Sequence, residues 1–340
     1  MSTNERLKCP NSYRQPDKHL TSLISDQWYA AILALTDCIA ASSFDFFRER
    51  GMRFVWTPLT TGSISSPVAP GSDSIPVRGH FFGRDVYLAD SMQFLLEAAL
   101  RLHRSGVFYI SCSLRGERPD ARHLAEFMHS EVEIAGDLEA VVLLAEEYVR
   151  HLAQRALAEV ADAVEALCGT TDHLRSLSAA GAFPRIRFTD AVQTLSQFPD
   201  AIRTPFPGAF ALTAEGEKLL LNEIRGPLWV THFPAVTSPF YQRISSDGIH
   251  SLSADLLMGD GEILGCGERC TTRDEVEQSL VRQRVDPRPY DWYLQLKELT
   301  PLSSAGFGLG VERLVRWMSQ AEDIRDCTLW LRDHEQPLDP

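Results

Sequence analysis

The stretch 303–318, SSAGFGLGVERLVRWM, constrains the fold most, because three glycines at alternate positions lead directly into a helical pattern. Gly306, Gly308 and Gly310 precede apolar residues that recur at helical spacing. This pattern predicts a strand or tight turn that feeds a helix. Alternate glycines let a ligand approach the backbone closely, and an arginine in the first helical turn could reach a phosphate there. The alternative is a glycine-rich loop before an ordinary amphipathic helix, since a glycine loop alone is a weak signal.

Composition limits the classes of partner. The chain has 340 residues, 44% of them apolar and 23% charged, enough to bury the core of one large domain or two smaller ones. Its formal net charge is -13, and no run of lysines and arginines interrupts that acidic balance. Because phosphate backbones are held chiefly by lysine and arginine, we expect no DNA partner and no tRNA partner.

The sequence also bears on cellular location. We see no apolar run approaching the ~20 residues that span a bilayer, and the N-terminus lacks the apolar core of a secretion signal. We therefore expect a cytoplasmic protein without a membrane partner. The seven cysteines are scattered and contain no CxxC pair, which favours reduced thiols over a disulfide framework or a structural zinc site.

Read in order, the chain divides into a polar lead-in, residues 1–24, and a catalytic domain, residues 25–340, with a helical segment at about 137–225. Periodicity predicts helices at 25–50, 91–103, 137–168, after Thr189, at 274–284 and at 290–299. Strands are predicted at 53–58, 80–88, 107–114 and 127–134, and four short ones follow residue 227, while 60–79 reads as a loop. The long segment 137–168 reads as a helix packed on the outside. Strands and helices do not alternate regularly, so we predict an α+β fold, with helices packed on one antiparallel sheet.

Two groups of polar residues could carry chemistry. In 115–127, Arg115 ends a strand, Arg122 and His123 lie in the following loop, and Phe127 begins the next strand. Such bases could hold several phosphates while the phenylalanine stacks on a purine, although a solvated charged turn is the alternative. Asp255 and Glu262 flank the turn Gly-Asp-Gly at 259–261.

On adjacent antiparallel strands, the carboxylates of Asp255 and Glu262 could share one Mg²⁺ bridging nucleotide phosphates. The alternative is two acids that face solvent.

The order of these pieces resembles a known family. SLRGERPDARHLAEF followed by EVEI resembles motif 2 of the class II aminoacyl-tRNA synthetases in its asparaginyl form, and GFGLGVERLVRW resembles motif 3. FFRERGMRFVWTP is similar to motif 1, while YLADSMQFLLE and DLLMGDGEILGCGER are similar to the amino-acid and metal segments of the asparaginyl and aspartyl enzymes. The resemblance covers roughly residues 28–332. It implies an antiparallel synthetase sheet flanked by helices, an ATP-dependent adenylate-forming ligase and, through motif 1, a homodimer.

The resemblance also implies roles for individual residues. Arg115 would hold the α-phosphate, Glu117 the adenine amino side, and Arg313 the other face of the adenine or the γ-phosphate. The set implied to bind ATP is Arg115, Glu117, Arg122, His123, Phe127, Gly308, Gly310 and Arg313, of which Arg115, Glu117 and Arg313 are the catalytic candidates. Ser91 and Gln93 would hold the substrate ammonium, Glu131 and Arg269 its side chain, and Asp255 and Glu262 would bind Mg²⁺.

Two departures from the family pattern pull in different directions. Only the first 24 residues precede the core, leaving no room for the anticodon-binding barrel of the synthetases. The archaeal asparagine synthetase related to these enzymes also lacks that barrel, and it transfers activated aspartate to ammonia. In contrast, Leu96 replaces the lysine by which aspartate-specific members read a carboxylate, and Glu131 could accept a hydrogen bond from an amide, which favours asparagine or a neutral analogue.

Three functions remain open on the sequence. The first is a free-standing ligase that activates an asparagine- or aspartate-like amino acid with ATP and passes the acyl group to a non-tRNA acceptor, such as ammonia or a small amine. The second is a truncated asparaginyl-tRNA synthetase-like enzyme that charges tRNA or a tRNA-like partner. The third is a non-catalytic regulatory paralogue, which the joint presence of Arg115, Glu117 and Arg313 disfavours.

Overall fold

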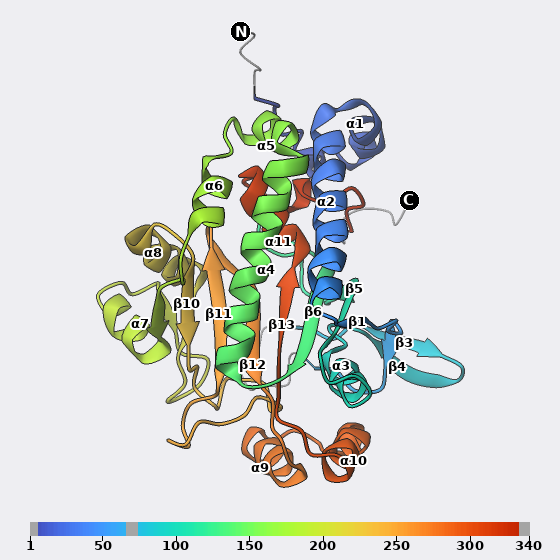
Figure 1. Ribbon diagram of the computed structural model, residues 1–340, viewed down its shortest axis with the longest axis vertical. Helices are drawn as coiled ribbons and strands as arrows, with labels where there is room; N and C mark the ends of the chain where they lie inside the picture. The colour runs from blue at the N-terminus through green and yellow to red at the C-terminus, as the bar shows by residue number, and fades with distance from the viewer. Residues whose placement is uncertain (1–5, 66–73, 333–340) are drawn as a thin grey trace.

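A computed structural model describes residues 6–65 and 74–332 and is organised around one large sheet (Figure 1). Its eight strands lie in the order β1-β5-β6-β13-β12-β11-β10-β7. The strands are β1 (Arg53–Phe54), β5 (Val107–Leu114), β6 (Glu126–Ala135), β7 (Arg185–Arg187), β10 (Leu228–Thr231), β11 (Ser253–Met258), β12 (Gly261–Glu268) and β13 (Ser304–Gly310). Smaller sheets contain β2 (Thr60–Thr61), β3 (Arg78–Phe81) and β4 (Arg84–Leu88), and β8 (Ile202–Arg203) with β9 (Ala211–Leu212).

The helices of the described chain cover the sheet and its ends. They are α1 (His19–Ser25), α2 (Gln27–Glu49), α3 (Gln93–Leu100), α4 (Leu138–Glu159), α5 (Ala161–Cys168), α6 (Asp172–Ala179), α7 (Phe188–Leu195), α8 (Ala214–Ile224), α9 (Arg273–Gln283), α10 (Asp291–Leu299) and α11 (Val311–Ser319). Strands and helices are therefore mixed without regular alternation. The predicted α+β class is confirmed.

The sheet is antiparallel except at its two edges. β5, β6, β13, β12, β11 and β10 form an unbroken antiparallel run, whereas β1 joins β5 and β7 joins β10 in parallel. The predicted hairpin of β5 and β6 is present, with Ser113 opposite Phe127. The glycine-rich strand β13 lies between β6 and β12, near the centre of the sheet. Any ligand of this strand is therefore surrounded by the longest strands.

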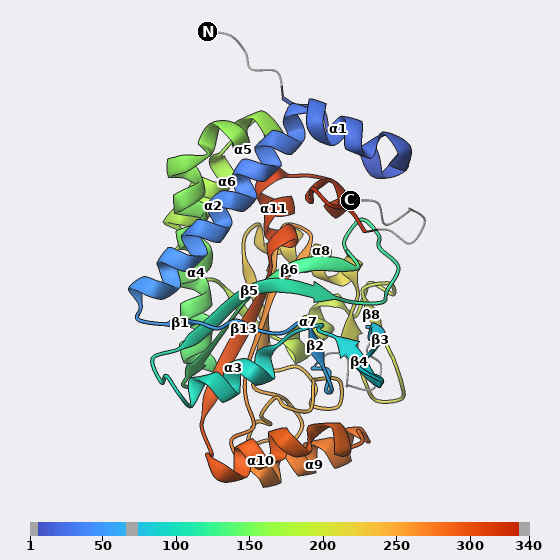
Figure 2. The same cartoon turned by 90° about the vertical axis from the view of Figure 1, so that its right-hand side faces the viewer.

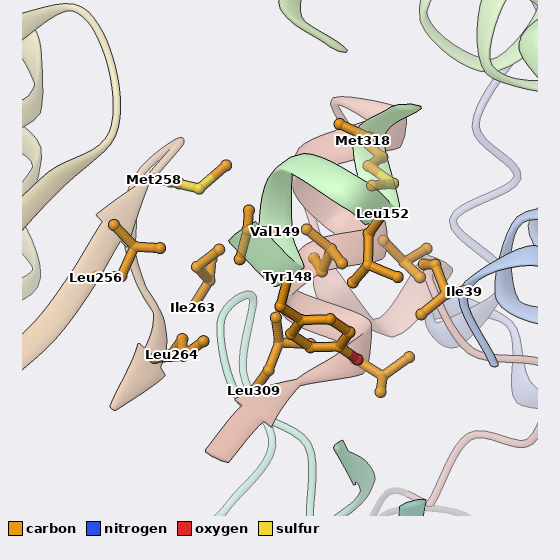
Figure 3. Close-up of a cluster of buried hydrophobic side chains, with 14 of the residues drawn as sticks. Ile39, Tyr148, Val149, Leu152, Leu256, Met258, Ile263, Leu264, Leu309 and Met318 are labelled. Carbon is orange, nitrogen blue, oxygen red and sulfur yellow. The ribbon is translucent and has the colours of Figure 1, made fainter. Parts of the chain in front are cut away.

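One face of the sheet carries the main hydrophobic core. The long helices α2 and α4 lie across it, as the turned view shows (Figure 2). Tyr148, Val149 and Leu152 of α4 point between the sheet and helices α2 and α11 (Figure 3). The ring of Tyr148 stacks on Phe307 of β13 at 5.6 Å, and its hydroxyl bonds Ser43 and Ser130. Burying side chains of this size, each contributing about 1.5–3 kcal/mol, fixes the helices on this face.

Strand alternation leaves the opposite face of β13 without side chains. Ala305, Phe307 and Leu309 are buried in the core, so the intervening glycines face the other way. At Gly306 an added Cβ would collide with the carbonyl oxygen of Val132 and the carboxylate of Glu133. The glycines therefore make room for side chains of β6, and the stretch is a strand feeding the helix α11, as predicted.

Several predicted elements differ from the structure. The segment 137–168 is two helices, because α4 ends at Glu159 and α5 begins at Ala161. Nine residues of α4 are buried, so it is a core helix rather than an outer one. In 169–226 three helices form where one was predicted, and β7 joins the main sheet. The predicted strand at 241–246 makes only isolated bridges. Residues 80–88 form a hairpin, and only Arg53 and Phe54 of 53–58 are in a strand.

The regions predicted to lack regular structure contain short elements. The lead-in includes two 3₁₀ turns, Ser12–Arg14 and Pro16–Lys18, before α1. In the predicted loop 60–79, β2 and the start of β3 are ordered strands, and residues 66–73 lie outside the described residues.

Among the described helices, α2 alone is long and apolar enough to cross a membrane by length and composition, yet half of its apolar window is buried in the protein.

Candidate active site

The cavity on the glycine face of β13 contains every residue predicted to bind ATP. It is about 100 Å³ in volume and lies between β5, β6, β12 and the first turn of α11. Its lining includes Arg115, Glu117, Arg122, His123, Phe127, Gly308, Gly310 and Arg313. The β5–β6 hairpin brings the two ends of 115–127 together. The pairing of β6 with β13 places Gly308 and Gly310 beside them.

Arg115 and Glu117 line this cavity, and each has one buried polar atom without a hydrogen-bond partner among the described residues. The two atoms are Nε of Arg115 and Oε2 of Glu117. A buried polar group without a partner is costly, which is expected where a ligand supplies the missing bond. The Arg115 guanidinium lies 5.5 Å from the ring of Phe127, close enough to act on the same ligand.

The other two arginines of the cavity are paired with carboxylates. Arg122 Nη2 lies 2.5 Å from Glu217 Oε2, and Arg313 Nη1 donates to the carbonyl of Glu262 at 2.8 Å and to its Oε2 at 3.3 Å. Burial raises the pKa of Glu217, while Arg122 opposes that rise. A polyphosphate entering here would compete with these carboxylates for the two guanidinium groups.

Asp255 and Glu262 lie close together beneath the cavity. A Cβ built on Gly265 would be 3.0 Å from Glu262 Oε1 and 3.3 Å from Asp255 Oδ1. Burial, Glu262 and Glu217 raise the pKa of Asp255 well above its usual value. Two carboxylates that repel each other suit a divalent cation with oxygen ligands, so the donor set fits Mg²⁺. No group of three or more His, Cys, Asp or Glu side chains in the described chain could hold a metal, so substrate phosphates or water must complete the shell.

A second cavity, about 280 Å³, adjoins the first and contains three of the four residues predicted to bind the amino acid. Ser91 and Gln93 lie at the start of α3, and Glu131 lies on β6 opposite Gly308. Ser91 Oγ donates to Glu131 Oε2 at 2.7 Å. Burial raises the pKa of Glu131 to about 7, against the lowering effect of its hydrogen bonds with Tyr109 and Ser91.

The fourth residue, Arg269, is placed behind this cavity rather than in its wall. It is 3% exposed, and its Nε and Nη2 donate to the carboxylate of Glu133 at 3.0–3.2 Å. With the amide of Gln242 oriented to satisfy both its ends, Arg269 Nη1 donates to it at 3.2 Å. These bonds use three of the five N–H donors of the guanidinium, so contact between Arg269 and a substrate side chain stays a prediction.

Leu96, at the position where aspartate-specific enzymes have a lysine, points away from the cavity. It is fully buried among Met92, Val107 and Tyr109. Arg115 is the one arginine or lysine in the cavity wall within the described residues, and it lies at the shared end next to Gly308. No arginine or lysine of the described cavity wall pairs with Glu131, although Arg269 behind the wall acts to lower its pKa.

Sequence reasoning did not select several residues that line the two cavities. His129 lies on the same face of β6 as Phe127 and Glu131, and the alternation of that strand could have indicated it. Tyr241 and Gln242 come from an irregular segment, where no periodic pattern exists to find them.

Comparison with known proteins identifies this arrangement. The sequence matches the tRNA synthetases class II (D, K and N) over residues 13–334, which include both cavities. The chain belongs to the class II aminoacyl-tRNA synthetases. This family consists of ATP-dependent ligases that form aminoacyl adenylates and use Mg²⁺.

Individual relatives of this class II synthetase chain are asparaginyl enzymes. It is 31% identical to the asparagine--tRNA ligase of Syntrophobacter fumaroxidans, covering 87% of this chain and 68% of that one, and 30% identical to that of Thermoplasma acidophilum. The asparaginyl-tRNA synthetase of Pyrococcus horikoshii, solved with asparaginyl-adenylate, has a TM-score of 0.85 and 26% identity, covering 95% of this chain and 73% of that one. These relatives are named for tRNA, so they give no support to the prediction that tRNA is not a partner.

Proposed function

We propose that this class II synthetase activates asparagine, or a neutral analogue of it, as an aminoacyl adenylate and transfers the acyl group to a small non-tRNA acceptor, ammonia or an amine. The observation that carries the choice of amino acid is Glu131, a buried carboxyl beside Ser91 in a cavity where no lysine or arginine faces it. A carboxylate there accepts a hydrogen bond from an amide nitrogen but repels a second carboxylate.

Activation would depend on the groups that line the first cavity. The unpaired Nε of Arg115 supports its role as the donor to the α-phosphate, where charge develops as the amino-acid carboxylate attacks. Phe127 would stack on the adenine, and Arg313 would leave Glu262 to contact the adenine or the γ-phosphate. Binding both substrates on one rigid sheet would supply most of the rate through positioning.

Mg²⁺ would be held by Asp255 and Glu262 and would neutralise charge on the phosphates of ATP. Burial and, after it, repulsion by Glu262 raise the pKa of Asp255, which supports this assignment, since a cation would relieve that repulsion. In this proposal the residues of the chain that contribute directly to catalysis are Arg115, Glu117 and Arg313.

The names of the relatives favour a second function, aminoacylation of tRNA or a tRNA-like partner. The acidic net charge of -13 and the absence of a basic run count against extensive contact with a phosphate backbone. The two functions share the activation step and differ only in the acceptor, so one assay can compare them.

The test measures amino-acid-dependent exchange of pyrophosphate into ATP across a panel that includes asparagine and aspartate. We expect exchange with asparagine, and amide formation when ammonia or a small amine is then added. Exchange with aspartate alone would refute the role of Glu131, and acyl transfer to tRNA but to no amine would favour the second function. Without exchange on any amino acid, both proposals fail.

The Arg313→Ala variant tests the nucleotide site in the same assay. Because its guanidinium is the cation at the start of α11, we expect exchange to fall by roughly 10²-fold or more. Exposed Arg14, which lies outside both cavities, provides the matched control as Arg14→Ala. Retained exchange in Arg313→Ala would show that the residue does not contact the nucleotide.

A further inference from the structure

His129 is the one side chain with a ring nitrogen that lines both cavities of the described site. Four residues are common to the two linings: Arg115, His129, Glu262 and Gly308. On β6, His129 stands between Phe127 and Glu131, because residues two apart share a face of a strand. The ring therefore lies where a nucleotide in one cavity and an amino acid in the other would be joined.

The hydrogen bonds of His129 leave one nitrogen available. Nδ1 lies 2.9 Å from Ser113 Oγ and 3.2 Å from Glu131 Oε1. Nε2 makes no hydrogen bond with any described residue, and the side chain is 13% exposed, toward the cavities. Both neighbours of Nδ1 can accept, Ser113 Oγ at any pH and Glu131 Oε1 when it is ionised, so we assign the proton to Nδ1, which leaves a lone pair on Nε2.

The surroundings keep the imidazole uncharged before ligands bind. Burial and the nearby cations Arg115 and Arg313 lower the pKa of His129 to about 3. Those same two arginines are the ones assigned to phosphates. A bound adenylate would offset the charge of Arg115, so the proton affinity of the ring would rise toward neutrality at the stage when the acyl group is transferred.

A small amine is the acceptor that needs a base at this junction. Asp255 and Glu262 of the cavity wall would be neutralised by Mg²⁺ in the proposed function, so they leave no negative charge to balance a cationic acceptor. Ammonium and protonated primary amines are positively charged, and they must lose a proton before nitrogen can act as a nucleophile.

We propose that His129 is the general base that takes the proton from a small amine acceptor as that amine attacks the acyl adenylate. This inference rests on the proposed function and adds to it the residue that handles the acceptor. The nitrogen lone pair forms a bond to the acyl carbon, and the bond from that carbon to the phosphate oxygen breaks. Its electron pair leaves with AMP. Two protons leave the nitrogen in turn through Nε2 to solvent, one that frees the lone pair of ammonium before the attack and one that is lost as the C–N bond forms, and the products are an amide and AMP. No atom is oxidised or reduced.

The His129→Gln variant separates activation from transfer. Pyrophosphate exchange with the preferred amino acid reports activation, and amide formation with ammonia reports the whole reaction. We expect exchange within about threefold of the parent, and amide formation lower by roughly 10²-fold, the usual contribution of a general base. Hydroxylamine, which is already unprotonated at neutral pH, should still form hydroxamate at a much smaller loss. The control is His80→Gln, on the exposed hairpin of β3 and β4.

His129→Ala with added imidazole provides a second measurement that does not depend on how well glutamine fits. Imidazole should restore amide formation without changing exchange. The inference is overturned if exchange and amide formation fall together in correctly folded His129→Gln, if neither falls, or if imidazole restores nothing. A parent protein that shows exchange but transfers the acyl group to no amine also overturns it, whereas a parent without exchange overturns the proposed function itself.

Discussion

At the scale of the residue, the site is defined by which buried polar groups have partners. Arg115 Nε and Glu117 Oε2 lack one, whereas Arg122 and Arg313 are neutralised by Glu217 and Glu262. We expect Arg115 and Glu117 to bind the ligand without giving up an existing partner. Arg122 and Arg313 would first have to leave their carboxylates in order to bind a phosphate. Selectivity for the amino acid depends on a single buried carboxyl, Glu131.

The Glu131→Gln variant tests that selectivity. A glutamine amide can donate to a carboxylate and carries no charge, so aspartate should gain relative to asparagine by about tenfold or more in pyrophosphate exchange. Exposed Glu215 on α8 supplies the control variant Glu215→Gln, which should keep the parental ratio. An unchanged ratio in Glu131→Gln would mean that another group reads the side chain.

At the scale of the element, β13 and β6 must approach closely for the site to form. Gly306 and Gly308 lack the side chains that would crowd the carboxylates of Glu133 and Glu131. The same strand carries Phe307 and Leu309 on its core face. One strand therefore provides part of the hydrophobic core and the floor of the active site.

Gly306→Ala should destabilise the protein, because the new Cβ would meet the Val132 carbonyl and the Arg269–Glu133 pair. A cost of about 1–3 kcal/mol is typical of overpacking, and urea unfolding would measure it. Gly181→Ala is the control, since nothing lies within 4 Å of a Cβ there. Equal midpoints for the two variants would contradict the tight contact between β13 and β6.

The junction of α11 with β6 predicts a pH dependence of stability. Glu312 is buried and accepts from Met128 N at 3.0–3.1 Å, and burial raises its pKa to about 7 from 4.5. The folded state then binds more protons than the unfolded state between these values, so the free energy of unfolding falls as pH rises from about 4.5 to 7.

Glu312→Gln removes this titration, and its stability should fall less than the parent's over the same window in urea unfolding at several pH values. Glu131 titrates in the same range and remains in both proteins, so the difference between them isolates Glu312. Parallel curves for the two proteins would show that Glu312 has an ordinary pKa.

At the scale of the whole molecule, we expect an exposed aromatic surface to be the place where a second copy of the chain binds. The face is formed by Leu33 and Phe44 of α2 with Trp56 after β1, and they are 54%, 38% and 89% exposed. Phe44, Phe54 and Trp56 form a continuous row of ring contacts. This is the motif 1 region, which implied a homodimer, and association would remove these rings from water.

Trp56→Glu should therefore weaken the dimer, because a charge would be buried in an apolar interface. Light scattering of the eluted protein over a range of concentrations would measure the shift toward monomer. Phe82→Glu changes an equally exposed aromatic residue, 91% exposed, on the β3–β4 hairpin, and should leave the mass unchanged. A fully dimeric Trp56→Glu protein would place the interface elsewhere.

The sequence by itself determined the antiparallel α+β class, the family and a group of residues that line one cavity. These rest on local patterns: alternation along β5, β6 and β13, and short motifs whose spacing a strand or turn preserves. The sequence could not locate the helices of 169–226, whose amphipathic turns are short, or the irregular segment that supplies Tyr241 and Gln242.

Only the tertiary structure decided which side chains face one another across strands. Arg269 pairs with Glu133 behind the amino-acid cavity, which the sequence did not indicate, and His129 joined the site because β6 alternation points it between Phe127 and Glu131. The physical reason is that pairing between distant segments sets these distances, and a buried ion pair or a free ring nitrogen exists only once the strands have paired.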